Sequence, residues 1–188
     1  MNSQKGFAGR TSKAMREIDG REAPCAAVDA LPAEFRAAMA EVCTPISVVT
    51  TVEDGRPHGT TVSAFLSLSM APPMVLVSLG NQSRLLEIVW RTGTFGLNVL
   101  AAGQSEYARH FGTKDPDKFD AIDWSYEHGV ARLPGVAVWV AGTVHTFVEG
   151  GDHMLILGDV AAVDATEFAP LTYHAHTFGT HARYAEAS

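Results

Sequence analysis

The sequence predicts a mainly β protein with short helices, arranged as a closed or partly open β-barrel with helical attachments. Short runs of β-branched residues are separated by turn residues, and strands do not alternate with helices as they do in parallel α/β folds. Two long strand-like runs also flank residues 149–152, whose sequence EGGD is typical of a hairpin turn. About six mostly antiparallel strands are therefore expected.

The chain begins with residues 1–30, where small and charged residues are mixed without a period. We expect an N-terminal arm or disordered leader there, followed by one domain over residues 31–188. Pro32 suits the first turn of a helix, which should end at Pro45. Apolar residues recur along one face of this helix at spacings of four and three: Phe35, Met39 and Val42.

The next part of the chain alternates β-rich runs with two short helical patterns. Strands are expected at residues 46–52, 59–68, 74–79 and 95–100. One helix is expected at residues 85–91, with Ser83 as its N-cap and Gly93 after its end, and another near residues 106–111.

The second half contains a long loop and two long strands. Residues 112–135 are polar and rich in turn residues, and a loop of this length is more often functional than idle. The two strands, at residues 136–148 and 153–163, flank the hairpin turn.

The charge balance and the uncharged segment limit the function classes. The 188 residues include 14 Lys and Arg against 21 Asp and Glu, a net charge of −7 that argues against a nucleic-acid or membrane surface. Residues 59–83 carry no charge and are long enough to cross a bilayer, but Pro72 and Pro73 would break a helix. We expect two buried strands joined by a proline turn, and a cytoplasmic protein.

Small hydroxyl side chains are concentrated in the first of these strands. If residues 60–69 form one strand, alternate side chains share a face, which would carry Thr61, Ser63, Ser67 and Ser69. Such a face could present hydroxyl and backbone groups to a flat polar ligand. A solvated barrel exterior explains the pattern equally well.

The segment from Gly80 to Arg84 leaves a strand and opens a helix. Backbone N–H groups at a helix start, with the Ser83 hydroxyl and the Arg84 guanidinium, would make a phosphate site. Most Ser-Arg pairs at this position are simply caps. Next to the hydroxyl-rich strand, however, the pair suggests one ligand with a planar head and a phosphate tail.

Histidines are unusually frequent, with eight in the chain. His153 follows Gly151 and Asp152 directly after the hairpin turn and could project from a barrel rim, although a surface histidine is the simpler explanation. Three more lie near the C-terminus, but their spacing does not match the usual zinc sites and we expect no metal: His174, His176 and His181.

Taken in order, several segments resemble the short-chain flavin reductases, which are reductase components of two-component flavin-dependent monooxygenases. The resemblance runs from about Phe35 to Phe178. It is carried by TPISVVTT, HGTTVSAFLSLSMAPPMVLVSLGNQSRLLE, FGLNVL, HFGTKDPDKFDAIDW, LPGVAVWVAGTV and GDHMLILGDV. It implies an FMN-binding split barrel, a homodimer, and reduction of FMN or FAD by NADH or NADPH for a partner monooxygenase.

The same resemblance implies roles for individual residues. The flavin ring and ribityl chain would be held by Thr61, Ser63, Ala64, Ser67 and Leu68. The ribityl-phosphate side would be lined by Ser78, Asn81, Ser83 and Arg84, and the outer edge by Phe111, Lys118 and Phe119. His153, in the turn with Gly151 and Asp152, would lie against the nicotinamide, and Phe178 would pack on the dinucleotide.

The chain departs from the family pattern at three positions. Pro45 stands where a glycine is usual, Phe178 replaces a common tyrosine, and Thr177 replaces a basic residue. Other split-barrel proteins remain alternatives, such as a cobalamin reductase or, less well matched, a pyridoxamine-phosphate-oxidase-like protein. A non-catalytic flavin-binding module is a further alternative.

Overall fold

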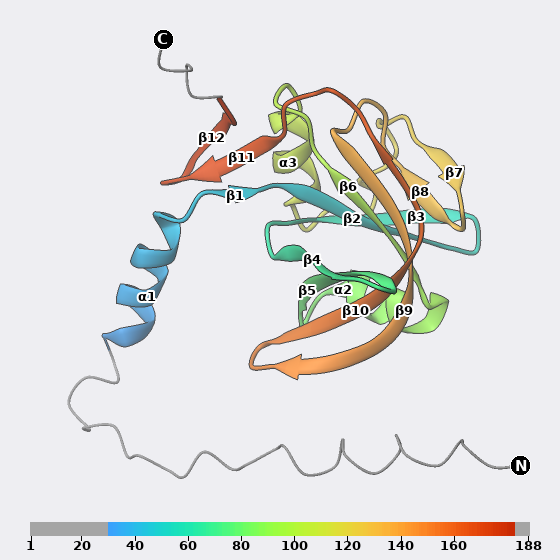
Figure 1. Cartoon of the computed structure of the whole chain (residues 1–188), viewed down its shortest axis with the longest axis horizontal. Helices are drawn as coiled ribbons and strands as arrows, with labels where there is room; N and C mark the ends of the chain where they lie inside the picture. Colours follow the sequence, from blue (N-terminus) through green and yellow to red (C-terminus); the bar gives the residue numbers. More distant parts are fainter. Residues whose placement is uncertain (1–29, 183–188) are drawn as a thin grey trace, which may run out of the picture. The chain divides into compact units, whose positions relative to one another are not determined.

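The computed structural model describes residues 30–182 and is mainly β with few short helices, as predicted (Figure 1). The predicted leader, residues 1–30, lies outside the described residues apart from Ala30. Contacts divide the chain between Ala37 and Ala38, and the unit that begins at Ala38 carries all of the strands. The helices are α1 (Leu31–Ala40), α2 (Arg84–Thr92) and α3 (Ser105–Phe111). None of them is long and apolar enough to span a bilayer.

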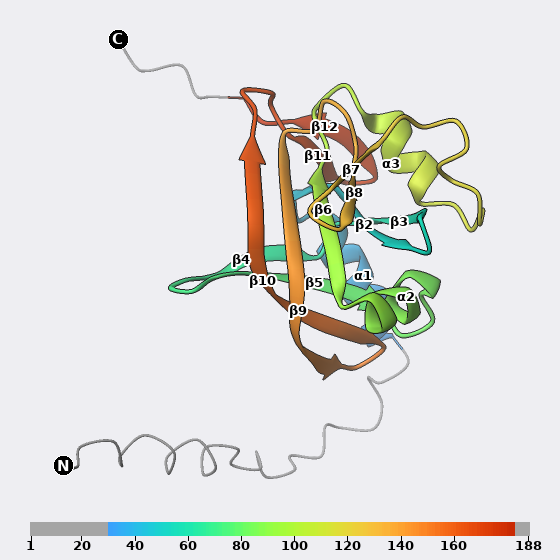
Figure 2. The same cartoon turned by 90° about the vertical axis from the view of Figure 1, so that its right-hand side faces the viewer.

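Seven strands form one antiparallel sheet, in which β9 and β10 are the long neighbouring pair seen in Figure 2. In sheet order, the strands are β3 (Arg56–Val62), β2 (Ser47–Glu53), β6 (Thr94–Val99), β9 (Val138–Gly150), β10 (His153–Ala165), β5 (Pro73–Gly80) and β4 (Phe65–Met70). The edge strands β3 and β4 are joined in the chain by Ser63 and Ala64 alone. Because so short a connection joins opposite edges, the sheet must curl until these edges meet, although no ladder closes it.

The prediction of one buried strand over residues 59–68 is wrong. The chain leaves β3 at Val62 and enters β4 at Phe65, so alternation cannot carry from Thr61 to Ser67. β4 is an edge strand with a register shift near Ser67, and its side chains Leu66 and Leu68 are 49% and 40% exposed. An edge strand has a neighbour on one side only, which explains why the uncharged sequence does not imply burial here.

Five short strands lie outside the predicted set. β7 (Ser125–Glu127) and β8 (Val130–Arg132) form a hairpin inside the long polar loop. Near the C-terminus, a three-stranded sheet is formed by β1 (Thr44–Pro45), β11 (Leu171–His174) and β12 (Thr177–Thr180). The first helix correspondingly ends at Ala40, earlier than expected, and Pro45 lies in a strand. Strands this short give too few residues for a visible alternation.

A buried polar residue ties the β7–β8 hairpin to the main sheet. Asn98, fully buried on β6, accepts a hydrogen bond from the Leu133 N–H at 2.9 Å through Oδ1. Its Nδ2 donates to the Val48 carbonyl at 3.2 Å. The two bonds satisfy both ends of the amide and fix the chain that returns from the long loop.

Candidate functional site

Three adjoining pockets form a groove along residues 60–64, which we call the central wall. The helix pocket, of about 370 Å³, lies at the start of α2. The central pocket, of about 280 Å³, shares Thr60 and Ser83 with it. The C-terminal pocket, of about 760 Å³, shares Thr61 and Ser63 with the central pocket. A ligand could therefore extend from the central wall in either direction.

The central pocket gathers six of the residues singled out in the sequence. It is lined by Thr61, Ser63, Ala64, Ser78, Ser83 and His153. Their side chains are mostly small, because the wall lies where β3 ends and the chain crosses to β4. Small side chains allow a flat ligand to approach the backbone closely.

Thr61 connects the central wall to α3 through its side-chain hydroxyl. Its hydroxyl donates to the Ala108 carbonyl on α3 at 2.8 Å. The hydroxyl can still accept a hydrogen bond, but its proton is used within the protein. Thr61 therefore fixes α3 against the central wall.

The helix pocket presents hydrogen-bond donors at the start of α2. Ser83 is the N-cap of α2, as predicted, but its hydroxyl makes no capping bond. Arg84 is exposed beside it, and no carboxylate among the described residues pairs with its guanidinium. A hydroxyl, a guanidinium and a helix N-terminus directed at one pocket suit a phosphate group.

The helix pocket is also lined by three further basic residues: His58, Lys114 and Lys118. The pKa values of His58 and Lys118 are lowered. Partial burial lowers the pKa of His58 below 6.5, and the positive charges of Arg84 and Arg56 lower it further. Burial also lowers the pKa of Lys118. Lys118 Nζ donates to the carbonyls of Gly59 on β3 at 3.2 Å and Phe111 on α3 at 2.8 Å. Two of its three N–H donors therefore hold the long loop against these two elements.

His153 is oriented by the residue before it. Its Nδ1 lies 2.7 Å from Asp152 Oδ1, and this interaction lowers the pKa of the Asp152 carboxyl. His153 pairs with Gly80 across the β10–β5 ladder, which places the imidazole at the central pocket. With Nδ1 engaged by the carboxylate, Nε2 is the nitrogen left for a ligand.

The turn that carries His153 is anchored to the start of the helix pocket. The Asn81 N–H donates to the Asp152 carbonyl at 2.9 Å, and Asn81 Nδ2 donates to the Gly151 carbonyl at 3.2 Å. None of these three residues lines the three pockets. They hold the turn in place, and their direct contact with flavin or dinucleotide stays a prediction.

Three other candidate residues also line none of the three pockets: Phe111, Ser67 and Leu68. Phe111 is fully buried in the core and packs edge-on against Phe119, with ring centroids 5.0 Å apart. Phe119 itself lines the helix pocket. Ser67 and Leu68 lie on the edge strand β4 and line none of the three pockets. Their contact with the flavin ring, which the family resemblance implies, stays a prediction.

Besides Thr61, Ser63 and Phe178, the C-terminal pocket is lined by residues that the sequence did not assign to the flavin or the dinucleotide. The Phe178 ring lies 5.0 Å from that of Tyr173 on the neighbouring strand, and Arg109 of α3 stacks over it at 4.9 Å. His176 lines the same pocket. Arg109 carried no motif signal, because only the tertiary contact between α3 and β12 brings it to Phe178.

The structure combines an open, curled sheet, a hydroxyl-lined groove and, at a helix start, an arginine that has no carboxylate partner within residues 30–182. These features suit a flat, phosphorylated ligand. The model of the flavin reductase like domain matches residues 39–182. The chain belongs to this family, and its fold is that of the split-barrel flavin reductases.

Relatives and solved structures agree with this assignment. The reductase subunit HsaB of a flavin-dependent monooxygenase from Rhodococcus jostii is 35% identical, covering 85% of this chain and 83% of the relative. The NADH-dependent FAD reductase of Streptomyces globisporus is 35% identical over 68% of this chain and 72% of its own length. A structure of the NADH:FAD oxidoreductase of Streptomyces globisporus with NAD and FAD fragments aligns with a TM-score of 0.78 and 29% identity, over 82% of this chain and 95% of that one.

Proposed function

We propose that this protein is an enzyme that reduces FMN or FAD with NADH or NADPH and supplies the reduced flavin to a partner monooxygenase. The observation that carries the proposal is the row of adjoining pockets along residues 60–64, with Ser83 and Arg84 at one end and His153 at the central pocket. The related reductase subunits and NADH-dependent reductases support the reaction and the partner.

The residues present fit a bound flavin. Small side chains at Ser63 and Ala64 open the central wall to a flat ring, and Ser83 and Arg84 provide donors for the phosphate. When bound together, the flavin and the dinucleotide supply the redox chemistry, a hydride transfer from nicotinamide C4 to flavin N5. The protein then has to position both rings in contact and needs no general base for the hydride step.

We assign a different task to each part of the groove. Backbone and hydroxyl donors of the central wall stabilise the electron-rich ring after reduction. Asp152 holds His153 so that Nε2 faces the nicotinamide side. Phe178 packs on the dinucleotide in the C-terminal pocket. These assignments rest on the geometry of the pockets and on the family relationship.

Flavin affinity should increase as the pH falls, because His58 lines the helix pocket. Its pKa is lowered in the free protein, and a bound phosphate anion would raise it, so binding takes up a proton. We expect the Kd of FAD to fall by about two- to fourfold between about pH 8 and pH 6. Fluorescence titration of FAD measures this, and a wild-type profile as flat as that of His58→Gln would contradict it.

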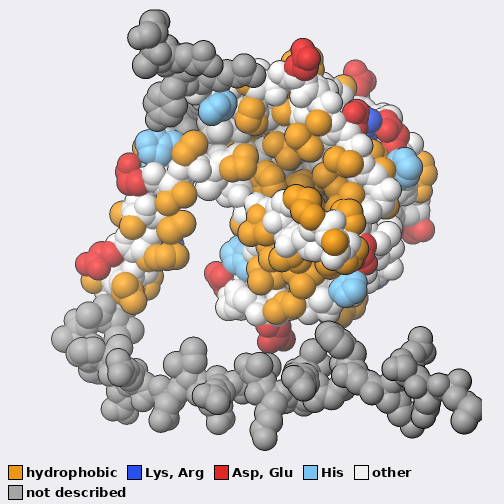
Figure 3. Space-filling view, in the orientation of Figure 1, with side chains coloured by type: hydrophobic (Ala, Val, Ile, Leu, Met, Phe, Trp, Pro, Cys, Tyr) orange, Lys and Arg blue, Asp and Glu red, His pale blue; other side chains and the backbone are white. Residues whose placement is uncertain are grey.

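We also propose that the protein is a homodimer and, because its substrates are intracellular metabolites, that it acts in the cytoplasm. Exposed apolar side chains support the dimer: Leu66, Leu68 and Met70 on β4 are 49%, 40% and 80% exposed. Figure 3 shows hydrophobic side chains gathered over the middle of the strand-rich unit. A face of this kind is typical of an interface. Sedimentation velocity should give about twice 20.1 kDa, and a monomer at micromolar concentration would contradict the proposal.

The reaction itself is tested by following NADH absorbance in air with purified protein. We expect no oxidation without added flavin and steady oxidation when FMN or FAD is present. A protein that binds flavin tightly without oxidising NADH or NADPH would instead be a binding module.

A further inference from the structure

We propose that Arg109 anchors the diphosphate of the nicotinamide dinucleotide and that the C-terminal pocket receives its ADP half. This inference rests on the proposed function, because it assumes that a dinucleotide occupies the groove. It adds a binding residue, Arg109, that neither the sequence motifs nor the fold assigns.

The position of Arg109 is fixed relative to the central wall. The hydrogen bond from Thr61 to the carbonyl of Ala108, the residue before Arg109, holds α3 there. The C-terminal pocket shares Thr61 and Ser63 with the central pocket, which His153 also lines. A dinucleotide with its nicotinamide beside His153 therefore has a direct path along the wall to Arg109.

The guanidinium of Arg109 retains donors for an anion. The guanidinium makes two hydrogen bonds within the protein, and Nη1 donates both of them. The acceptors are Glu106 Oε1 at 2.6 Å and Ser105 Oγ at 3.3 Å. Within residues 30–182, Nη2 and Nε have no hydrogen-bond partner. The Phe178 ring covers one face of the guanidinium, which leaves the in-plane N–H groups to bind phosphate oxygens.

The surroundings of Arg109 suit a nucleotide. The pocket has a volume of about 760 Å³, within the range of small-molecule sites. Tyr173 and Phe178 provide aromatic faces on which a purine can stack. Among the described residues, Arg109 is the only lysine or arginine that lines this pocket.

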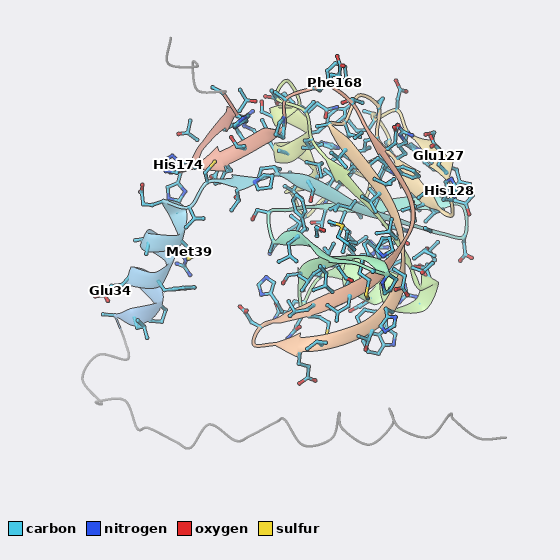
Figure 4. All side chains as sticks on the ribbon, viewed as in Figure 1. Glu34, Met39, Glu127, His128, Phe168 and His174 are labelled. Atoms are coloured by element: carbon cyan, nitrogen blue, oxygen red, sulfur yellow. The ribbon has the colours of Figure 1, made fainter. Side chains whose placement is uncertain are left out.

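The hairpin turn between β11 and β12 has two residues with positive φ angles. Ala175 and His176 have φ values of 46° and 61°, a left-handed conformation that turns of this type usually give to glycine or asparagine. Figure 4 labels His174 at the end of β11, directly before this turn. Strained residues of this kind cluster at binding sites, and this turn brings the His176 side chain to the pocket.

The two arginines of the groove serve different ligands. Arg84 lines the helix pocket and Arg109 lines the C-terminal pocket, and these two pockets share no residue. The flavin phosphate and the dinucleotide diphosphate therefore bind at opposite ends of the central wall. Substitution of each arginine should weaken only one of the two substrates.

The test compares Arg109→Ala with the wild type in steady-state kinetics, with ADP as a probe of the pocket. We expect the KM for NADH to rise by about 5- to 10-fold with kcat little changed, since the lost interaction is charge-assisted but exposed. ADP should inhibit the wild type competitively against NADH and inhibit the variant more weakly. Arg109→Lys, which keeps the charge, should recover part of both effects.

Glu106→Gln is the matched control, because it removes the ion pair but keeps the guanidinium, and its KM for NADH should not rise. An unchanged KM for NADH in Arg109→Ala would overturn the inference, as would weaker flavin binding in place of weaker NADH binding. Failure of the proposed function would look different from failure of the Arg109 inference, because the wild type itself would then not oxidise NADH.

Discussion

Replacing His153 by alanine should lower kcat/KM for NADH by about 100-fold, a loss expected when a reacting group is misplaced by about 1 Å. Asp152 orients the imidazole at 2.7 Å, and the side chain lines the central pocket, where the nicotinamide must meet the flavin. The proposed phosphate site lies in the helix pocket, which His153 does not line, so the Kd of FMN should change little. Steady-state kinetics and a flavin titration measure the two quantities separately.

His145→Ala is the matched control for this variant. His145 is also an exposed histidine paired with an aspartate, Asp159, at 3.1 Å, but it lines none of the three pockets. Its kcat/KM for NADH should equal that of the wild type. If His153→Ala also behaves like the wild type, His153 does not belong to the site.

Replacing Arg84 by alanine should raise the Kd of FMN by about 10- to 150-fold, because a hydrogen bond to a charged group contributes about 1.5–3 kcal/mol. The guanidinium has no carboxylate partner among the described residues, so its loss breaks no ion pair there and should leave the fold intact. The effect should weaken at high salt, as expected of an exposed charge.

Arg91→Ala provides the comparison on the same helix. Arg91 lies in the last turn of α2 and pairs with Glu53 at 2.7 Å, away from the helix pocket. Its removal should leave the Kd of FMN unchanged. Equal flavin affinity in Arg84→Ala and the wild type would contradict the phosphate assignment.

Much of the fold was predictable because its long strands carry their own signals. The β-branched run before Glu53, the hairpin turn before His153 and the amphipathic helix after Ser83 appear in the structure at nearly the predicted residues. The break at Ser63 and Ala64 was not visible, since hydroxyl and apolar residues alternate through it. Whether a strand is central or at an edge depends on partners distant in the chain, and a local pattern does not specify them.

Some residues of the candidate site could likewise be predicted from the sequence, and others could not. Ser83, Arg84 and His153 stand beside turns or helix starts, where the sequence indicates that backbone or side-chain groups are available. Arg109 could not be identified, because its contact with Phe178 joins residues 69 positions apart across two elements. The supporting role of Asn81 likewise depends on the pairing of β5 with β10.

An anaerobic single-turnover experiment tests most directly whether one groove brings flavin and dinucleotide together. The protein is saturated with FMN, mixed with NADH in a stopped-flow instrument, and followed by flavin absorbance. We expect rapid loss of the oxidised flavin absorbance, with one NADH consumed per flavin, and a much slower loss in His153→Ala. Bound flavin that stays oxidised after mixing with NADH or NADPH would contradict it.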